Sequence, residues 1–565
     1  MRNGILSRVA LGLAVYSLAP AGSQAAAETT TPPLVYLEQG WSPERRDDFY
    51  YTAQGSRLVP YAWIRALEEP DGEAPFFGSS HLKRLGFLPA DGPSRLNPDE
   101  LPIGFVKDPA PAEAGPWLGM TCAACHTGEI AFRGKRVRID GGPSLADFDT
   151  FMIRFSKAFD ATLAEPAKFA RFADKADAQD RTRLRAQVDA YGARLRKLVA
   201  VNWTPEPYGH GRLDAFGHIL NAVAGEGLGE PTNYRMPDAP VSYPFLWTTP
   251  QQRYVQWNGI ATNPMGRNTG EVLGVFGEMT LRASNAQFTS SAIAENLHAL
   301  ELWVNELKPP RWPDDIFGAT NSAKADRGSA LFQTHCQGCH AGQPYRYTAA
   351  EENKFGRRLL AVRMIEQTIV GTDPKMLDNF YGRRARTGEL AHLFRDAAEV
   401  PGGAVLGGVV AKIIQRDFSD RKVPPARQAE YAGFRFMPDG TFEPGWSGRP
   451  SYKANPLAGI WATAPYLHNG SVPTLYDLLS PENERPAVFW VGSREFDPVK
   501  VGFVAGEDAL PEAERSRLFR FDTSRPGNSN RGHAFPDPAR TRLDHEDRLA
   551  LIEFLKTLEG PDGAR

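Results

Sequence analysis

The stretches Cys122-Ala-Ala-Cys125-His126 and Cys336-Gln-Gly-Cys339-His340 decide how this chain has to fold. Both have the C-x-x-C-H pattern by which a c-type haem is attached to a protein. The two thiols add to the haem vinyl groups, and the histidine that follows is then held where its imidazole reaches the iron. Each stretch therefore supplies a tether and a ligand, and the sequence predicts two covalently bound c-type haems.

Two other interpretations of the cysteine pairs are weaker. A zinc site requires a second pair of cysteines or histidines at metal-binding spacing close by, and neither motif has one. A redox dithiol does not require the histidine that follows. The four cysteines are also the only ones in 565 residues, so both pairs are used and none is left over.

The N-terminus has the pattern of a secretory signal peptide. Arg2 and Arg8 precede the apolar run 9–18, and small residues follow over 21–27. The apolar run is too short to span a bilayer permanently, although an uncleaved membrane anchor is the alternative. Because c-type haem is attached outside the cytoplasm in bacteria, export agrees with the haem prediction. We expect cleavage after residues 1–27 and a periplasmic or secreted protein.

Composition narrows the remaining function classes. The formal net charge is −2 and there is no basic run, which argues against binding to nucleic acid or anionic lipid. No other stretch approaches about 20 consecutive apolar residues, so we expect no stable membrane insertion. The 53 Gly and 46 Pro, without any repeat, indicate long ordered loops around a rigid centre. Two buried macrocycles would provide that centre.

We expect a mainly α fold with long irregular loops and two cytochrome c-like haem domains. The N-terminal domain should cover 28–315 and the C-terminal domain 316–565. In the second domain a short helix leads to Cys336 and a terminal helix over 544–558 crosses it, as in small cytochromes c, with an insertion near 341–448. Hydrophobic periodicity predicts further helices over 143–163, 165–201 and 290–307.

The motifs do not assign the ligands on the far side of each iron. Nine of the 11 histidines lie outside the motifs, and a lone histidine is more often structural than a ligand. His533, in a glycine-rich loop before the last helix, is favoured as distal ligand of the second haem. His468 more often marks a propionate or structural contact than iron ligation. For the first haem, His210 and His218 are distal candidates or pack near a propionate through Arg212.

Aromatic residues between the two motifs are candidates for a catalytic pocket. An iron with His126 on one side and bulky aromatic rings on the other stays five-coordinate and can bind dioxygen or peroxide. Trp247 and Trp257, with Phe245 and Phe276, are the best choices for the pocket or for a bridge between the haems. The alternative is ordinary aromatic core.

Further stretches extend this pattern over nearly the whole mature chain: Leu101-Pro-Ile-Gly-Phe-Val, Tyr208-Gly-His-Gly-Arg-Leu-Asp-Ala-Phe-Gly217, Ser242-Tyr-Pro-Phe-Leu-Trp-Thr-Thr-Pro250, Val255-Gln-Trp-Asn-Gly259, Ala458-Gly-Ile-Trp-Ala-Thr-Ala-Pro-Tyr-Leu-His-Asn-Gly-Ser-Val-Pro473, Val491-Gly-Ser-Arg-Glu-Phe-Asp-Pro498 and Gly527-Asn-Ser-Asn-Arg-Gly-His533. At these residues the chain resembles the di-haem oxygenase group of the di-haem cytochrome c peroxidase superfamily. Its best-known members are the di-haem rubber oxygenase and the di-haem fatty-acid dioxygenases. The segment around His468 is the less specific part, because the wider superfamily shares a version of it.

The resemblance implies a mostly helical protein with a five-coordinate N-terminal haem that holds dioxygen and a bis-His C-terminal haem. In the peroxidases, the histidine of the matching Pro-Tyr-x-His motif is not the iron ligand. This favours His533 over His468 as the axial residue. Because the chain is shorter than the rubber oxygenases, we do not carry rubber over as its substrate.

We therefore expect an exported di-haem oxygenase in which His126 holds the working haem. An unsaturated apolar substrate, a fatty acid or an isoprenoid, would be oxidised at its double bond. The haem carries the oxygen chemistry, and the protein supplies orientation and a dry environment.

Two alternatives remain open. A di-haem peroxidase, fed by a small redox protein, would use a polar group such as His210, His218 or Glu271 to move protons at the open iron. A non-catalytic electron-transfer cytochrome would have two six-coordinate haems and would bind no ligand.

Overall fold

The computed structural model describes residues 32–109, 115–340, 342–433, 435–441, 443–535 and 542–561. The predicted signal peptide, residues 1–27, lies outside these ranges. Within them, no helix combines the length and the apolar composition needed to cross a membrane.

The expected mainly α fold is wrong, because the structure is mixed, with 40% helix and 14% strand. The strands form two three-stranded sheets, in the orders β1-β6-β5 and β2-β4-β3, and several two-stranded ribbons. Sequence periodicity misses them because most are only two to six residues long. A strand this short, such as β5 with its first four residues all buried, shows no apolar–polar alternation to read.

The predicted helices form with adjusted ends. The helix expected over 143–163 begins at Phe148, and the one expected over 290–307 is Ala294–Glu306. The stretch 165–201 divides into Pro166–Lys175 and Arg181–Val201, because the chain turns at Asp177, which has φ +50°. In the first half of the chain the helices are α1 (Pro43–Tyr51), α2 (Ser79–Arg84), α3 (Phe148–Ala164), α4 (Pro166–Lys175), α5 (Arg181–Val201), α6 (Ala215–Leu220), α7 (Pro264–Gly274) and α8 (Ala294–Glu306). A π-helical segment, Asn221–Gly227, follows α6.

The strands of this half are β1 (Leu34–Tyr36), β2 (Val59–Pro60), β3 (Phe105–Asp108), β4 (Trp117–Met120), β5 (Thr127–Phe132), β6 (Lys135–Asp140), β7 (Arg212–Leu213), β8 (Val241–Ser242), β9 (Met279–Thr280) and β10 (Thr289–Ser290). The second half contains the helices α9 (Asp314–Phe317), α10 (Ser322–His335), α11 (Gln367–Val370), α12 (Lys375–Gly382), α13 (Gly402–Asp420), α14 (Pro425–Tyr431), α15 (Leu475–Leu478), α16 (Glu512–Arg515) and α17 (His545–Lys556). Its strands are β11 (Arg363–Glu366), β12 (Arg384–Arg386), β13 (Glu399–Pro401), β14 (Ser451–Ala454), β15 (Val488–Val491), β16 (Phe496–Asp497), β17 (Gly502–Phe503) and β18 (Phe519–Asp522).

The first cysteine motif lies between two strands rather than at the end of a helix. A short 3₁₀ turn, Cys122–Ala124, connects β4 to β5, and β5 pairs antiparallel with β6 from Thr127 to Phe132. The backbone at Gly104 (φ +83°) presses against this turn, since a Cβ there would lie 2.1 Å from the Ala124 nitrogen. Glycine is therefore required where the neighbouring loop supports the motif.

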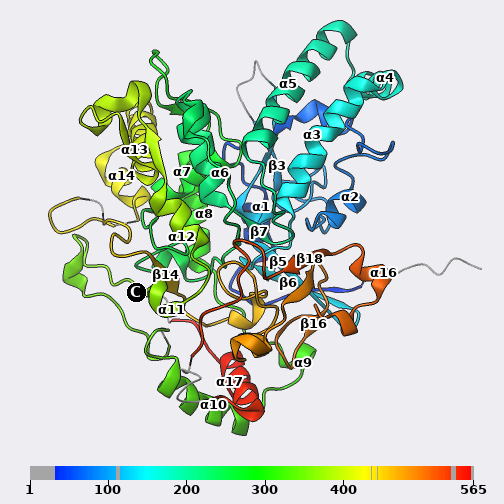
Figure 1. Ribbon diagram of the computed structural model, residues 1–565. Helices are drawn as coiled ribbons and strands as arrows, with labels where there is room; N and C mark the ends of the chain where they lie inside the picture. Colours follow the sequence, from blue (N-terminus) through cyan, green and yellow to red (C-terminus); the bar gives the residue numbers. More distant parts are fainter. Residues whose placement is uncertain are drawn as a thin grey trace, which may run out of the picture.

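The second motif follows the C-terminal end of α10, as expected. Helix α17 packs across α10, and their backbones are in close contact at Gly328, where a Cβ would lie 2.0 Å from the carbonyl oxygen of Ala550. Asp544 and Asp547 form a capping box that fixes the start of α17. The helix pair expected of a small cytochrome c is thus present around the second motif (Figure 1).

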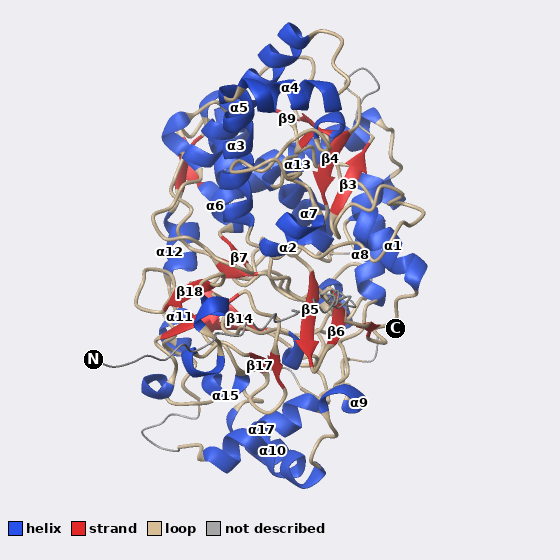
Figure 2. Cartoon of the chain, turned by 90° about the vertical axis from the view of Figure 1, so that its right-hand side faces the viewer, coloured by secondary structure: helices blue, strands red, loops and turns tan. Residues whose placement is uncertain are grey.

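Elements of the two sequence halves are interleaved in space. Helices α12 and α13, from the expected insertion, lie beside α6 and α7 in Figure 1. The contact is apolar, with Ile219 and Leu273 in one cluster with Val405 and Val409. Figure 2 shows most short strands and long loops between these upper helices and the α10–α17 pair. The division into domains at residue 315 stays a prediction.

Candidate haem sites

His126 is held as a metal ligand has to be held. Its Nδ1 lies 2.7 Å from the carbonyl oxygen of Pro244. A carbonyl oxygen can only accept, so Nδ1 carries the proton and Nε2 keeps a free lone pair. Burial lowers the pKa of His126 to about 4, so the ring is neutral at physiological pH. The residue is therefore prepared to bind an iron.

His340 repeats this arrangement in the second motif. Its Nδ1 lies 2.9 Å from the carbonyl oxygen of Asn455, and burial lowers its pKa. The two motifs lie on different scaffolds, yet each presents a neutral imidazole that is fixed by a backbone carbonyl.

His533 faces His340. The two ring centroids are 6.0 Å apart, a separation that matches two imidazole nitrogens each about 2 Å from one shared metal ion. His533 is half-buried, its Nδ1 has no hydrogen-bond partner within the described ranges, and desolvation lowers its pKa to about 3. Arg485 fixes the loop by donating to the carbonyl oxygens of Gly532, at 2.9 Å, and His533, at 3.4 Å. The residues present thus fit an iron between His340 and His533.

Each motif opens onto a cavity of its own. The first cavity is bordered by Cys122, Cys125 and His126, and the second by Cys336, His340 and His533. Seven residues line both cavities and form what we call the shared wall: Ser242, Tyr243, Pro244, Phe245, Trp257, Lys453 and Asn455. The carbonyl acceptors of both motif histidines, Pro244 and Asn455, belong to this wall.

The first cavity contains a half-buried carboxyl group, that of Glu271. Gln256 Nε2 donates to Glu271 Oε1 at 2.8 Å, and burial raises the pKa of Glu271 above its ordinary value. Arg267, on the same helix, pairs instead with Glu301 at 2.5 Å. Among the described residues Glu271 therefore has no direct ion pair, and beside the haem site it holds a proton more readily than an exposed glutamate.

A half-buried amine, that of Lys453, lies in the shared wall. Lys453 Nζ donates to Gln252 Oε1 at 2.6 Å, and burial lowers its pKa to about 7. Lys453 and Gln256 were not predicted from the sequence. Lys453 lies in none of the quoted stretches, and Gln256 lies in Val255-Gln-Trp-Asn-Gly259 but was not singled out there. The place of both residues in the site depends on distant segments that the fold brings together.

The two predicted tryptophans occupy different positions. Trp257 lies in the shared wall, where its Nε1 donates to the Ser242 carbonyl at 3.0 Å. Trp247 lines neither cavity. Its ring stacks on Phe245 at 4.7 Å, and its Nε1 donates to the Ala458 carbonyl at 3.0 Å. Phe245 lies in the shared wall, so Trp247 supports that wall from behind and has no contact with a cavity that would give it a catalytic role.

The other candidate histidines differ in which cavity they line and in what they contact. His468 lines the second cavity and stacks on Tyr452, with 4.0 Å between ring centroids. His218 lines the first cavity, with Nε2 3.3 Å from the Tyr208 hydroxyl. His210 contacts the Leu145 carbonyl at 2.8 Å and lines neither cavity. Arg212 also lies outside both cavities and donates to Asn528 Oδ1 at 2.8 Å.

Comparison with known proteins supports a haem relationship. A family model described as RoxA-like, cytochrome c-like matches residues 451–490, which include β14 and His468. The uncharacterized protein y4iJ of Sinorhizobium fredii is 36% identical over 585 residues, covering 93% of each chain. This chain belongs to the y4iJ family. The uncharacterized protein y4iM of the same organism is 27% identical over 330 residues, covering 56% of this chain and 63% of y4iM.

For this member of the y4iJ family, the match supports a relationship to RoxA-like haem oxygenases and suggests c-type haem. The wider di-haem peroxidase superfamily is not shown. The matched segment is one cytochrome c-like region, so the expected pair of cytochrome c-like domains is not supported. Neither C-x-x-C-H motif lies within residues 451–490.

Proposed function

We propose that the protein is an exported haem-dependent oxygenase that oxidises an unsaturated apolar substrate, a fatty acid or an isoprenoid, with dioxygen. Its two c-type haems would be held by Cys122, Cys125 and His126 and by Cys336, Cys339, His340 and His533. When bound, the haem held by His126 would supply the activation of dioxygen.

One observation carries this proposal, the difference between the two motif histidines. His340 has a second imidazole in ring contact, whereas the described ring contact of His126 is Tyr243, at 6.4 Å. The other histidine of the first cavity, His218, is hydrogen-bonded to Tyr208 and lies edge-on to Phe148 at 6.1 Å. This supports one closed site and one open site, as an enzyme requires and a simple electron carrier does not.

The walls of the first cavity suit an apolar substrate. Phe49, Leu300 and Val304 are buried and line it together with Trp257. Such side chains exclude water and orient a hydrocarbon chain beside the site. Adding both atoms of dioxygen across a carbon–carbon double bond and cleaving it gives two carbonyl products, which needs neither external electrons nor a proton donor.

Glu271 favours a second candidate, reduction of hydrogen peroxide. Peroxide takes up two electrons and two protons to give two waters, and a half-buried carboxyl group with a raised pKa can relay those protons. A small redox protein would supply the electrons under this candidate.

Product analysis separates these functions. The haem-loaded protein is incubated with oleate or squalene and ¹⁸O₂ without reductant, and in parallel with peroxide and a reduced small cytochrome. We expect labelled carbonyl products from the first reaction, and none with His126→Ala, which should keep one intact haem. Peroxide turnover without labelled product would replace the oxygenase proposal with the second candidate.

Carbon monoxide provides the test against a non-catalytic carrier. We expect the spectrum of the reduced protein to change at one haem only. A spectrum that does not respond at either haem would remove both enzyme proposals.

Export is tested separately, by fractionating cells that express the full chain. Mature protein lacking residues 1–27 is expected outside the cytoplasm. Unprocessed protein in the cytoplasmic fraction would contradict this part of the proposal.

A further inference from the structure

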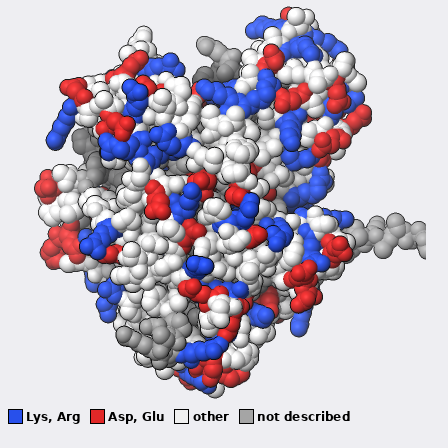
Figure 3. Space-filling model, in the orientation of Figure 1, with Lys and Arg blue, Asp and Glu red and all other residues white. Residues whose placement is uncertain are grey.

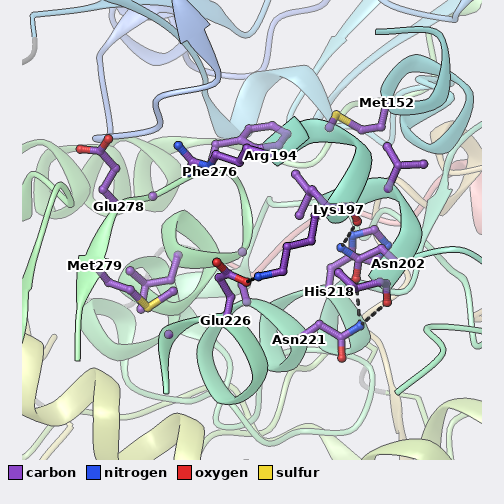
Figure 4. A pocket seen from close by; sticks show the side chains of 18 of the residues that line it. Met152, Arg194, Lys197, Asn202, His218, Asn221, Glu226, Phe276, Glu278 and Met279 are labelled. Atoms are coloured by element: carbon purple, nitrogen blue, oxygen red, sulfur yellow. Dashed lines mark hydrogen bonds and ion pairs between the residues drawn. The ribbon is translucent and has the colours of Figure 1, made fainter. Parts of the chain in front are cut away.

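A larger cavity, which we call the vestibule, adjoins the first haem site. It has a volume of about 820 Å³, within the range of small-molecule sites. Helices α3 and α5, the π-helical segment Asn221–Gly227 and strands β9 and β10 line it (Figure 4). The vestibule lies between two lobes of the molecule, one that contains α4 and α5 and one that contains α13 and α14. Figure 3 shows a hollow in the surface between the two lobes.

The vestibule and the first cavity share part of one wall. Phe148, His218 and Gly274 line both. Phe276 stacks on Phe148 with 6.0 Å between centroids, and His218 lies edge-on to Phe148 at 6.1 Å. These three aromatic rings form a partition between the two spaces. Phe276 has φ +66°, a conformation that bulky residues rarely adopt and that the surrounding structure has to enforce.

The vestibule combines an apolar lining with an unbalanced positive charge. Among its charged residues, Lys197 pairs with Glu226 at 2.5 Å, as Figure 4 shows, and Arg57 pairs with Glu278. Within the described ranges, Arg194 and Arg282 have no ion pair.

The remaining acid of the lining is Asp149. Burial raises its pKa to about 6, so its carboxyl group is still mostly ionised at neutral pH and offsets one of the two arginines. The lining thus has four cationic side chains, Arg57, Arg194, Lys197 and Arg282, against three carboxylates, Asp149, Glu226 and Glu278, and the remaining positive charge favours an anion.

The apolar part of the lining lies on helices and strands around the partition. Met152, Leu198, Val201, Leu273 and Leu281 contribute to it. Arg194 and Arg282 are exposed, whereas Leu273 and Leu281 are buried. The vestibule thus presents charge where it meets solvent and hydrocarbon surface farther in.

We propose that the vestibule binds an amphiphile with one anionic head group and an apolar chain. The head group lies against Arg194 and Arg282, and the chain passes the partition of Phe148, His218 and Phe276 to reach the first haem cavity. This inference rests on the proposed oxygenase function for its purpose, although binding itself can be measured without turnover.

The test compares oleate with oleyl alcohol, which has the same chain without the charge. Affinities for the haem-loaded protein are measured by titration calorimetry. Because exposed charge contacts contribute little each, Arg194→Gln with Arg282→Gln should weaken oleate binding by only about fivefold to tenfold. Oleyl alcohol should be unaffected. The matched control is Arg183→Gln, on the same helix but outside the lining, which should change neither affinity.

A second variant tests the location by filling the space. Ala222→Phe adds a ring inside the vestibule and should abolish oleate binding, while an unchanged carbon monoxide spectrum shows that the protein is folded and the first haem is intact. Oleate affinity that is the same in the double variant and in the parent, or that survives Ala222→Phe, would overturn the inference.

The vestibule and the proposed function can fail independently. Arginine-dependent oleate binding without any oxygenated product supports the vestibule and removes the oxygenase. Labelled product from squalene at equal rates in all variants, without oleate binding, keeps the oxygenase and removes the vestibule.

Discussion

Single hydrogen bonds define the roles of the motif histidines. His126 and His340 each direct Nδ1 at a backbone carbonyl, at 2.7 and 2.9 Å, so side-chain substitutions at Pro244 or Asn455 leave the acceptors in place. The difference between the sites comes from the opposite side, where His533 meets His340. Its position depends on a loop conformation with φ +49° that Arg485 and the Val370 carbonyl stabilise.

The first prediction concerns this opposite ligand. His533→Ala should convert the second haem from low-spin to high-spin, because the imidazole opposite His340 is removed. Electron paramagnetic resonance of the oxidised protein measures the change. His468→Ala, which removes a histidine of the same cavity that stacks on Tyr452, is the control and should leave the low-spin signal intact. A low-spin signal that persists in His533→Ala would show that another residue is the ligand.

The second prediction concerns Glu271. Glu271→Gln keeps the size of the side chain and removes the proton that a peroxidase would relay. If peroxide is reduced at all, its turnover should fall by about 10²- to 10⁴-fold, whereas substrate-dependent oxygen consumption should be nearly unchanged.

The pH dependence of this second reaction has a definite sign. Because burial raises the pKa of Glu271, the carboxyl group stays protonated to a higher pH than usual. Peroxide turnover of the parent should therefore decline as pH rises through that raised pKa, and the decline should be absent in Glu271→Gln. Stopped-flow peroxide assays across the pH range test this, and an identical profile in both proteins would exclude Glu271 as the proton donor.

At the scale of elements, sequence reasoning succeeded where the signal is local. The helices with regular apolar spacing were predicted because periodicity is read within one segment, and the α10–α17 pair was expected around Cys336 from the arrangement in small cytochromes c. The strands β4 and β5 around Cys122 were not, since neither is long enough to show alternation. The shared wall could not be predicted either, because Trp257 and Lys453 are far apart in the sequence. They become neighbours only in the folded chain, where Lys453 N donates a hydrogen bond to the Trp257 carbonyl oxygen.

The third prediction tests the helix pair that carries the second motif. Gly328→Ala should destabilise the protein by about 1–3 kcal/mol, because its Cβ would overlap the Ala550 carbonyl and force α10 from α17. Gly407→Ala, at an exposed position of α13 with no atom within 4 Å of the new Cβ, should stabilise it by about 0.5–1 kcal/mol. Thermal unfolding monitored by circular dichroism measures both. Equal effects of the two substitutions would contradict the close approach of α10 and α17.

At the scale of the whole molecule, both halves of the sequence contribute to the hydrophobic core and to the wall between the two cavities. One hydrophobic cluster contains Phe49 and Leu300 from the first half together with Trp461 and Leu555 from the second. The shared wall between the two cavities is also built from both halves, because β8 and the residues after it come from the first half and β14 comes from the second. A change in the wall should therefore affect both haems, whereas a change in either motif should affect one.

Lys453 allows this coupling to be measured. Its ammonium group borders both cavities and is charged below its lowered pKa of about 7. A positive charge favours the reduced state of a nearby redox centre, so Lys453→Met should lower both reduction potentials. At an effective dielectric constant of about 20 and a separation of about 10 Å, the interaction is roughly 1–2 kcal/mol, or some tens of millivolts. The shift should be full at pH 6 and should shrink as pH rises through about 7, because the parent then loses its charge. Spectroelectrochemical titration measures it, with Lys157→Met on the exposed surface of α3 as the control. A shift confined to one haem would show that the wall separates the two sites electrostatically instead of linking them.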